Sequence, residues 1–196
     1  MRERGMTAAE ILVAIAILAA LVLAAAPAAA HLRNGGRAAA GARWVATSFA
    51  AERWRAVTLA RAGGYHFAPD AGVWSWLPVE DGNGNGLRTA EVRTGTDRAR
   101  DLRRRLGRDV DGVEFGIPPG GPFPEAPPGT GTIGSGEDPV RFGRSDLVSF
   151  SPDGSASSGT LYVTDGMDGL FAVVLFGPTA RVRVWRYDRR SGRWTR

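Results

Sequence analysis

The chain of 196 residues contains no cysteine and no lysine, and its only histidines are His31 and His66. The absence of cysteine excludes both a disulfide framework and a thiol nucleophile. With two histidines available, a histidine-based metal or catalytic centre is not expected. The sequence also shows no serine, histidine and aspartate arrangement and no paired carboxylates of the kind that hydrolases use. We therefore expect a protein that is not an enzyme.

Glycine, proline and apolar residues are plentiful by contrast. The chain has 27 Gly and 12 Pro, and 43% of its residues are hydrophobic. This length and composition are typical of a single folded domain with a core and many turns. A turn-rich body of short β-strands is the expected result.

The first thirty residues hold the strongest signal. Residues 11–30 are twenty uncharged and almost wholly apolar positions, enough for a helix of about 30 Å that matches the hydrocarbon thickness of a bilayer. Arg2 and Arg4 precede the run, which predicts a cytoplasmic N-terminus. An ordinary signal peptide, cut near residues 28–30, is the alternative. Glu10 argues against it, because a carboxylate at the edge of a membrane segment usually marks a function.

Residues 4–13, with the sequence RGMTAAEILV, resemble the prepilin leader of type IV pilins and type II secretion pseudopilins. The resemblance implies that a prepilin peptidase cuts between Gly5 and Met6, that Met6 is then methylated, and that Glu10 becomes the fifth mature residue. It also implies that Glu10 pairs with the amine of Met6 of a neighbouring subunit during fibre assembly, since a buried carboxylate is tolerated when it meets a cation. Met6 stands where the family usually has Phe.

A second helix pattern follows at residues 37–61, where Val45 and Phe49 share one face. Trp44 and Trp54 are expected in the core of the head. The predicted fold is α+β: a long N-terminal helix, membrane-spanning in its first half, packed on an antiparallel β-sheet head of the type IV pilin kind. The expected segments are a leader (1–5), a transmembrane and assembly helix (6–30), a continuing amphipathic helix (31–62) and a β-rich periplasmic head (63–196).

Short β-compatible runs fill the head. A hairpin is predicted from residues 65–67 and 73–77, which flank a Pro-Asp-Ala-Gly turn. A further strand is expected at 113–117, and four closely spaced runs predict an antiparallel meander at 147–150, 160–164, 170–176 and 181–187. The Gly- and Pro-rich segment 118–139 is expected to form a long surface loop.

Sequence motifs near the C-terminus indicate which pilin-like family the chain resembles. Residues 150–154 (FSPDG), residues 159–163 (GTLYV) and the Arg-Val-Arg run at 181–183 are similar to the minor pseudopilin family labelled GspH/FimT. Many members of that family have Gly before the Arg-containing run, whereas Ala180 takes that position here.

The loop that starts at Asp81 resembles the beginning of a calcium-binding EF-hand loop. Asp81, Asn83 and Asn85 alternate, and Gly86 is the sixth residue. The closing acid should be the twelfth residue, but Glu91 is the eleventh. The alternative is a glycine-rich turn in which Asp and Asn side chains bond their own backbone. No cofactor is expected, and calcium is the one alternative.

Two arginine-rich stretches stand out. Residues 98–108 mix six Arg with acids and are expected to form a solvated charged segment. The C-terminal stretch alternates Arg with aromatic residues, a pattern that suits phosphates and stacked bases. The candidate DNA-binding residues are Arg181, Arg183, Arg186, Arg189, Arg190 and Arg193. The alternative is an edge strand protected by charge.

The sequence thus predicts a minor pseudopilin, a structural subunit of a type II secretion pseudopilus, with a DNA-binding minor pilin of a type IV pilus or competence system as the alternative. The expected location is the bacterial inner membrane, with a single crossing and the head in the periplasm. The expected partners are other pilin or pseudopilin subunits, the prepilin peptidase, the inner-membrane assembly platform, membrane lipid and, in the alternative, DNA.

Overall fold

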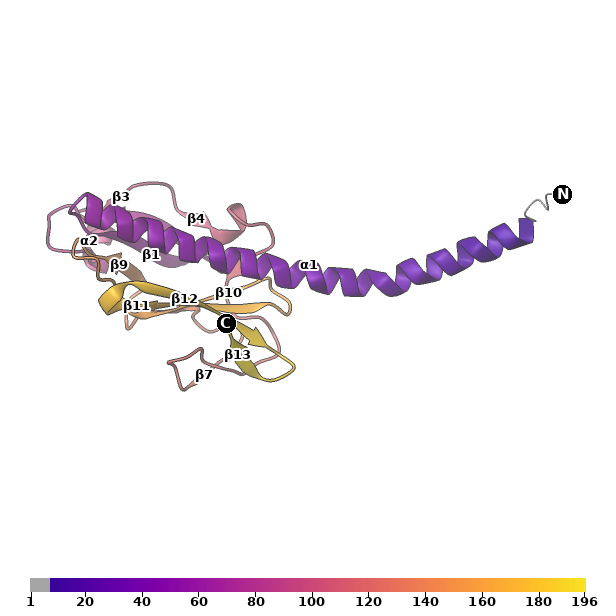
Figure 1. The fold of residues 1–196 in the computed structure, drawn as a ribbon. Coiled ribbons are helices and arrows are strands. Elements are labelled where there is room, and N and C mark those ends of the chain that lie inside the picture. The colour runs from indigo at the N-terminus through magenta and orange to yellow at the C-terminus, as the bar shows by residue number, and fades with distance from the viewer. Residues whose placement is uncertain (1–7) are drawn as a thin grey trace.

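The computed structural model describes residues 8–196, and within them all side chains except those of residue 10 and residues 24–35. One long helix, α1 (Ala8–Thr58), precedes a body made almost entirely of antiparallel strands. Figure 1 shows the second half of α1 lying along this body, while the first half extends away from it.

The second half of α1 is held by a stripe of small and aromatic side chains. Ala38, Ala42, Val45 and Phe49 are each fully buried, and Ala56 continues the stripe one turn beyond Glu52. Their spacing of three or four residues places them on one face of the helix. This face packs against the strands of both main sheets.

The first sheet contains the predicted hairpin. Strands β1 (Gly63–Asp70) and β2 (Val73–Glu80) pair from Gly63↔Glu80 to Asp70↔Val73. The two turn residues Ala71 and Gly72 both have positive φ, as the tight turns that suit the twist of a hairpin require. The remaining strands give the order β3-β2-β1-β9, with β4 also on β2: β3 (Arg98–Ala99), β4 (Arg104–Arg105) and β9 (Leu147–Phe150).

The second sheet confirms three of the four strands of the predicted C-terminal meander, because β10, β11 and β12 are neighbours in the order β13-β12-β11-β10-β5. The fourth predicted run, residues 147–150, is β9 and pairs with β1 of the first sheet instead. Strand β8 also pairs with β10. The strands are β5 (Glu114–Phe115), β8 (Val140–Arg141), β10 (Gly159–Thr164), β11 (Leu170–Phe176), β12 (Arg181–Asp188) and β13 (Arg193–Thr195). Strand β11 is buried along its length up to Leu175, as a central strand covered on both faces should be. Short helices α2 (Thr89–Thr94), η1 (Leu106–Arg108) and η2 (Gly177–Thr179) lie in connections.

Aromatic rings join the helix and the two sheets into one core. The ring of Phe49 on α1 lies 5.9 Å from that of Tyr65 and 5.7 Å from that of Phe150. Trp76 stacks on Tyr65 and meets Phe115 of the second sheet edge-on at 5.4 Å. The sheets therefore share their hydrophobic core with α1.

The segment expected to be a surface loop, residues 118–139, is mostly exposed, but it is more ordered than predicted. This segment forms a small two-stranded sheet of β6 (Phe123–Pro124) and β7 (Thr132–Ile133), and it packs on the outer face of the second sheet. Phe123, Ala126 and Ile133 are buried there, and the Ala126 N–H donates to the Tyr162 hydroxyl at 3.1 Å. A few apolar residues at the right spacing are enough to hold a segment that composition alone assigns to solvent.

The predicted fold class also needs correction. Over the residues placed in the structure, no helix combines the length and the apolar character that a membrane crossing requires. This finding contradicts the expected transmembrane helix and, with it, the expected single-pass inner-membrane location.

Candidate functional site

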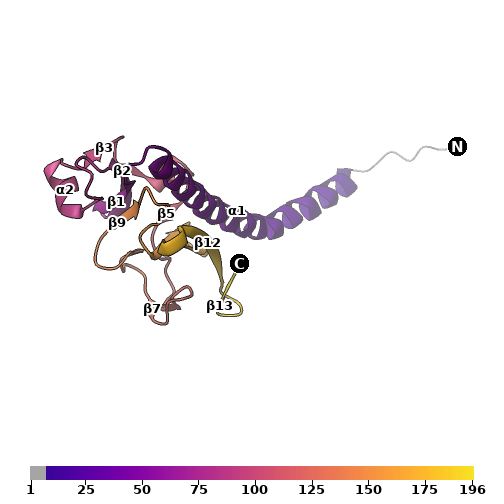
Figure 2. The same cartoon turned by 60° about the vertical axis from the view of Figure 1, so that its left-hand side comes forward.

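The first half of α1 is an apolar helix surface with no cover. Figures 1 and 2 show it running clear of the two sheets. Residues 11–23 contain no charged residue, and their large side chains are 45–76% exposed. These side chains are Ile11, Leu12, Val13, Ile15, Ile17, Leu18, Leu21, Val22 and Leu23.

Apolar side chains surround this part of α1 instead of forming a single stripe. Helices that are apolar all round are normally buried on every side, and exposed apolar patches of this kind mark interaction sites. A shallow, open depression lies on the helix between Ala9, Val13, Ala14 and Ile17. Small residues beside larger ones form the holes into which side chains of a facing helix insert.

The head fixes the direction of α1 through close packing and a buried ion pair. At Gly41 a Cβ atom would lie 2.5 Å from Val113 Cγ1, so only glycine allows this approach. Glu52 is 3% exposed and forms an ion pair with Arg100. Burial raises the pKa of Glu52, although Arg100 and Arg55 act in the opposite direction. The Arg55 guanidinium also donates to Glu80 at 2.8 Å, which ties α1 to β2.

The outer face of α1 over the head differs from expectation. Trp44 and Trp54 were expected in the core, but they are 45% and 69% exposed. Neither falls on the buried stripe of Val45 and Phe49, because neighbouring helix positions are 100° apart. The two indoles add exposed apolar surface to the part of α1 that lies along the head.

The predicted N-terminal site lies mostly beyond what the structure shows. Gly5 and Met6 fall outside the described residues. Glu10 belongs to α1, but its side chain is not among those described. Cleavage at Gly5, methylation of Met6 and the pairing of Glu10 remain predictions.

The Asp81 loop is organised by its own backbone. Asp81 Oδ1 accepts the N–H groups of Asn83 at 3.0 Å and Gly84 at 2.7 Å, and Oδ2 accepts that of Gly86 at 2.7 Å. Burial acts to raise the pKa of Asp81, but these N–H groups outweigh it and hold the pKa below its ordinary value. Asp97 supports the loop by accepting the Gly82 and Arg88 N–H groups.

The other candidate calcium ligands are also engaged. The side-chain amides of Asn83 and Asn85 each donate to Glu91, at 2.9 Å. Among residues 8–196 as described, no three His, Cys, Asp or Glu side chains form a group that could hold a metal ion. The geometry is that of the turn in which Asp and Asn bond nearby backbone and side-chain groups.

The candidate DNA-binding arginines do not form one patch. Arg189 binds the main chain, donating to the carbonyl oxygens of Asp168, Met167 and Pro119 at 3.0–3.1 Å. It also lies over the Phe123 ring at 5.2 Å. Arg189 therefore fastens the β6–β7 segment to the C-terminal hairpin.

The strand alternation of β12 separates the remaining arginines. Arg181 and Arg183 are exposed on one face of the sheet, and Arg181 pairs in register with the 56% exposed Phe176 of β11. Arg186 points to the opposite face, because its position has the other parity. Arg193 is the register partner of Asp188, and Arg190 lies in the turn between β12 and β13. Within the described part of the chain, Arg181 and Arg183 form no ion pair.

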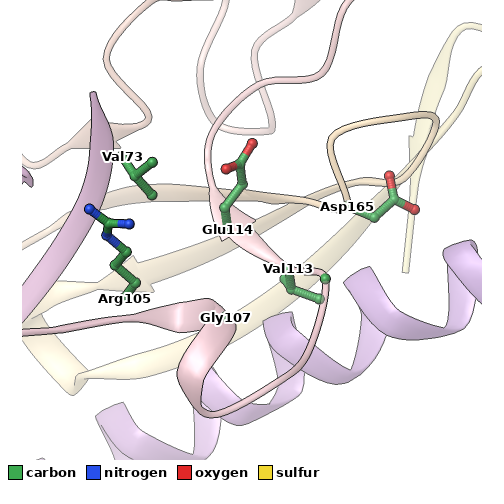
Figure 3. Close-up of a pocket in the computed structure, with 7 residues that line it drawn as sticks. Val73, Arg105, Gly107, Val113, Glu114 and Asp165 are labelled. Carbon is green, nitrogen blue, oxygen red and sulfur yellow. The ribbon is translucent and has the colours of Figure 1, made fainter. Parts of the chain in front are cut away.

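A cavity of about 310 Å³ lies between the sheets near η1. Figure 3 shows Arg105 on one side and the carboxylates of Glu114 and Asp165 on the other. Asp165 Oδ1 accepts the N–H groups of Met167 and Gly169, each at 3.0 Å. Opposite charges and a lining without a Ser, Thr or His nucleophile or base give this cavity no evident reaction chemistry. Sequence reasoning missed it because Arg105 and Asp165 are far apart in the chain.

Comparison of the chain with protein-family models, curated proteins and solved structures gives no match.

Proposed function

We propose that this chain is a structural subunit of a protein fibre, a minor pseudopilin of a type II secretion pseudopilus. The observation that carries the proposal is the uncovered apolar surface of α1 at residues 11–23. A helix with this surface gains free energy when neighbouring helices cover it, and a fibre built from side-by-side helices provides that cover. The exposed Trp44 and Trp54 offer a second apolar contact surface on the part of α1 that lies along the head.

The arrangement of the two halves of α1 suits such a role. One half is fastened to the sheets by the buried stripe and by the Glu52–Arg100 ion pair. The other half is free to bind neighbouring subunits, and the depression at Ala14 would receive a side chain of a facing helix. In the proposed fibre, Glu10 pairs with the amine of Met6 from the next subunit after a prepilin peptidase has removed residues 1–5.

The proposal can be tested by deleting the gene in its native host and measuring the proteins released into the medium. Loss of a defined set of secreted proteins is expected, with full recovery on return of the natural gene. Ala14→Asp should not restore secretion, because it places a charge in the depression of the helix surface. The matched control is Thr130→Asp, the same kind of change at an exposed position of the head, and it should restore secretion.

Immunoblots must show equal amounts of both variants, so that loss of the protein is not mistaken for loss of assembly. Unchanged secretion after gene deletion would refute the secretion role. Full activity of Ala14→Asp would refute the role of the helix surface.

A second candidate function is DNA binding by a minor pilin of a type IV pilus or competence system. The observation that favours it is the pair Arg181 and Arg183, exposed beside Phe176 on one sheet face. Two guanidinium groups next to an exposed ring can contact a phosphate and stack on a base.

Gel-shift measurements over a series of salt concentrations test this candidate. If both arginines bind phosphates of duplex DNA, replacing them with Gln should reduce the slope of log affinity against log salt by about 1.8, roughly 0.9 for each contact. Arg43→Gln, an exposed change on α1, is the control. An unchanged slope would exclude this sheet face as the DNA site.

A further inference from the structure

Four arginines gather around a second cavity next to the one in Figure 3. This cavity of about 350 Å³ is lined by Asp70, Ser75, Arg103, Arg104, Arg105, Gly107 and Arg108. It shares Arg105 and Gly107 with its neighbour. The formal charge of the lining is +4 − 1 = +3, from the four Arg and one Asp named for it.

Folding holds these arginines in place. Strand β4 pairs with β2, with Arg105 opposite Ser75 and Arg104 opposite Trp76. The next residue, Leu106, is fully buried, and its carbonyl oxygen accepts the N–H groups of Asp109 and Val110 at 2.9 Å. The segment expected to be solvated is therefore anchored in the core between Arg105 and Arg108.

Two of the arginines are already engaged. Arg103 donates to the His66 carbonyl oxygen at 3.2 Å and to His66 Nδ1 at 2.9 Å. Burial lowers the pKa of His66, and the nearby Arg103 and Arg93 lower it further. A guanidinium can only donate, so His66 Nδ1 is the acceptor in this bond. Arg105 donates to the carbonyl oxygen and carboxylate of Asp70, at 3.0 and 3.2 Å.

The other two arginines, Arg104 and Arg108, form no side-chain hydrogen bonds with the described residues. Arg104 lies 3.6 Å from Asp101 and 3.8 Å from Asp109, too far for hydrogen bonds, and its Nε is buried without a partner. Arg108 is exposed and has no hydrogen bond or ion pair with any residue that the structure places. Guanidinium N–H groups that have no hydrogen-bond acceptor, on a segment held by the core, are suited to bind an anion with several oxygens.

We propose that this cavity binds a small free anion of the phosphate class, with Arg104 and Arg108 as its principal donors. Its volume is at the lower end of the range of small-molecule sites, roughly 300 to 1,000 Å³. The formal charge of the lining is +3, and it is still positive, at +4 − 3 = +1, when Asp101 and Asp109 beside Arg104 are counted, so the cavity favours an anion. The proposal is independent of fibre assembly.

Isothermal titration of the full chain with inorganic pyrophosphate, at constant ionic strength, tests the proposal. Saturable one-to-one binding is expected. Arg108→Gln should weaken it by about tenfold, since a charge-assisted hydrogen bond contributes about 1.5 kcal/mol or more. The control is Arg186→Gln, which makes the same change in charge on strand β12 of the other sheet and should leave binding unchanged.

Arg108→Gln is the deciding variant, because Arg108 contacts no described residue through its charge and its loss leaves the fold intact. Equal binding by Arg108→Gln and the natural chain would overturn the proposal, as would the absence of saturable heat. Binding of duplex DNA without binding of pyrophosphate would also overturn it, since the ligand would then be a polymer surface and not a small anion.

Discussion

Asp81 provides a direct test of how its loop is held together. Its carboxylate accepts three backbone N–H groups within the next five residues, and it is 3% exposed. In Asp81→Ala all three donors lose their acceptor. In Asp81→Asn, the side-chain oxygen of Asn can still accept hydrogen bonds, but its NH2 group replaces the second carboxylate oxygen and cannot accept from the backbone N–H group that it faces.

The three bonds set the expected size of the effect. With about 1 kcal/mol for each bond, Asp81→Ala should lower the free energy of unfolding by about 3 kcal/mol. Asp81→Asn should lower it by about 1 to 2 kcal/mol, because two acceptor contacts survive at neutral strength. The control is Asp111→Ala, whose side chain is 95% exposed, and its effect should stay within about 0.5 kcal/mol.

The effect of Asp81 should also depend on pH in one direction. Its folded-state pKa is lowered, so its contribution is fully present above the unfolded value of about 3.9. The contribution is lost as pH falls through the lower folded-state value. The difference in unfolding free energy between the natural chain and Asp81→Asn should therefore shrink below about pH 4.

Urea unfolding of the full chain, followed by circular dichroism at pH 7 and at steps down to pH 3, measures these quantities. The order Asp81→Ala, then Asp81→Asn, then Asp111→Ala is expected at pH 7. If Asp81→Ala were no more harmful than Asp111→Ala, the carboxylate would not be what organises the loop. A difference that grows on acidification would contradict the assigned direction of the pKa shift.

Three further predictions concern the core, the N-terminus and calcium. Phe49→Ala should lower the free energy of unfolding in urea by about 3 to 5 kcal/mol. Trp54→Ala, at a 69% exposed position, should lower it far less. Similar losses of stability in both variants would show that Phe49 is not central to the core. Intact-mass spectrometry of the chain from its native host should show residues 1–5 absent and Met6 methylated, and a chain beginning near residue 31 would indicate an ordinary signal peptide. Calcium titration should give no saturable heat at micromolar concentrations, and a one-to-one isotherm abolished by Asp81→Ala would contradict this.

Local sequence patterns predicted several strands well, because each of these patterns lies within one short segment of the chain. The runs at 147–150 and 170–176 match β9 and β11 residue for residue, because apolar residues bounded by turn residues leave few alternatives. The stripe of Val45 and Phe49 was also readable, since helical periodicity reports the buried face. These signals are local, so one sequence is enough to reveal them.

Features that depend on contacts between distant segments were missed. Phe123 and Ile133 appeared too isolated to hold a segment, yet the outer face of the second sheet receives both. Arg104 belonged to a run that looked solvated, but pairing with Trp76 on β2 places it beside a cavity. The membrane crossing was predicted from the length and hydropathy of the apolar run near the N-terminus, and hydropathy cannot distinguish a lipid-covered helix from one covered by protein.

The unequal exposure of the tryptophans gives the chain a built-in optical reporter. Trp44 and Trp54 lie open on α1, whereas Trp76 is 1% exposed in the core. Iodide in solution can reach the first two indoles and quench their emission, while Trp76 remains bright. Any neighbour that lies along α1 should shield the open pair, so a fall in the quenchable share, above the contribution of the half-buried Trp74, Trp185 and Trp194, reports assembly without a label.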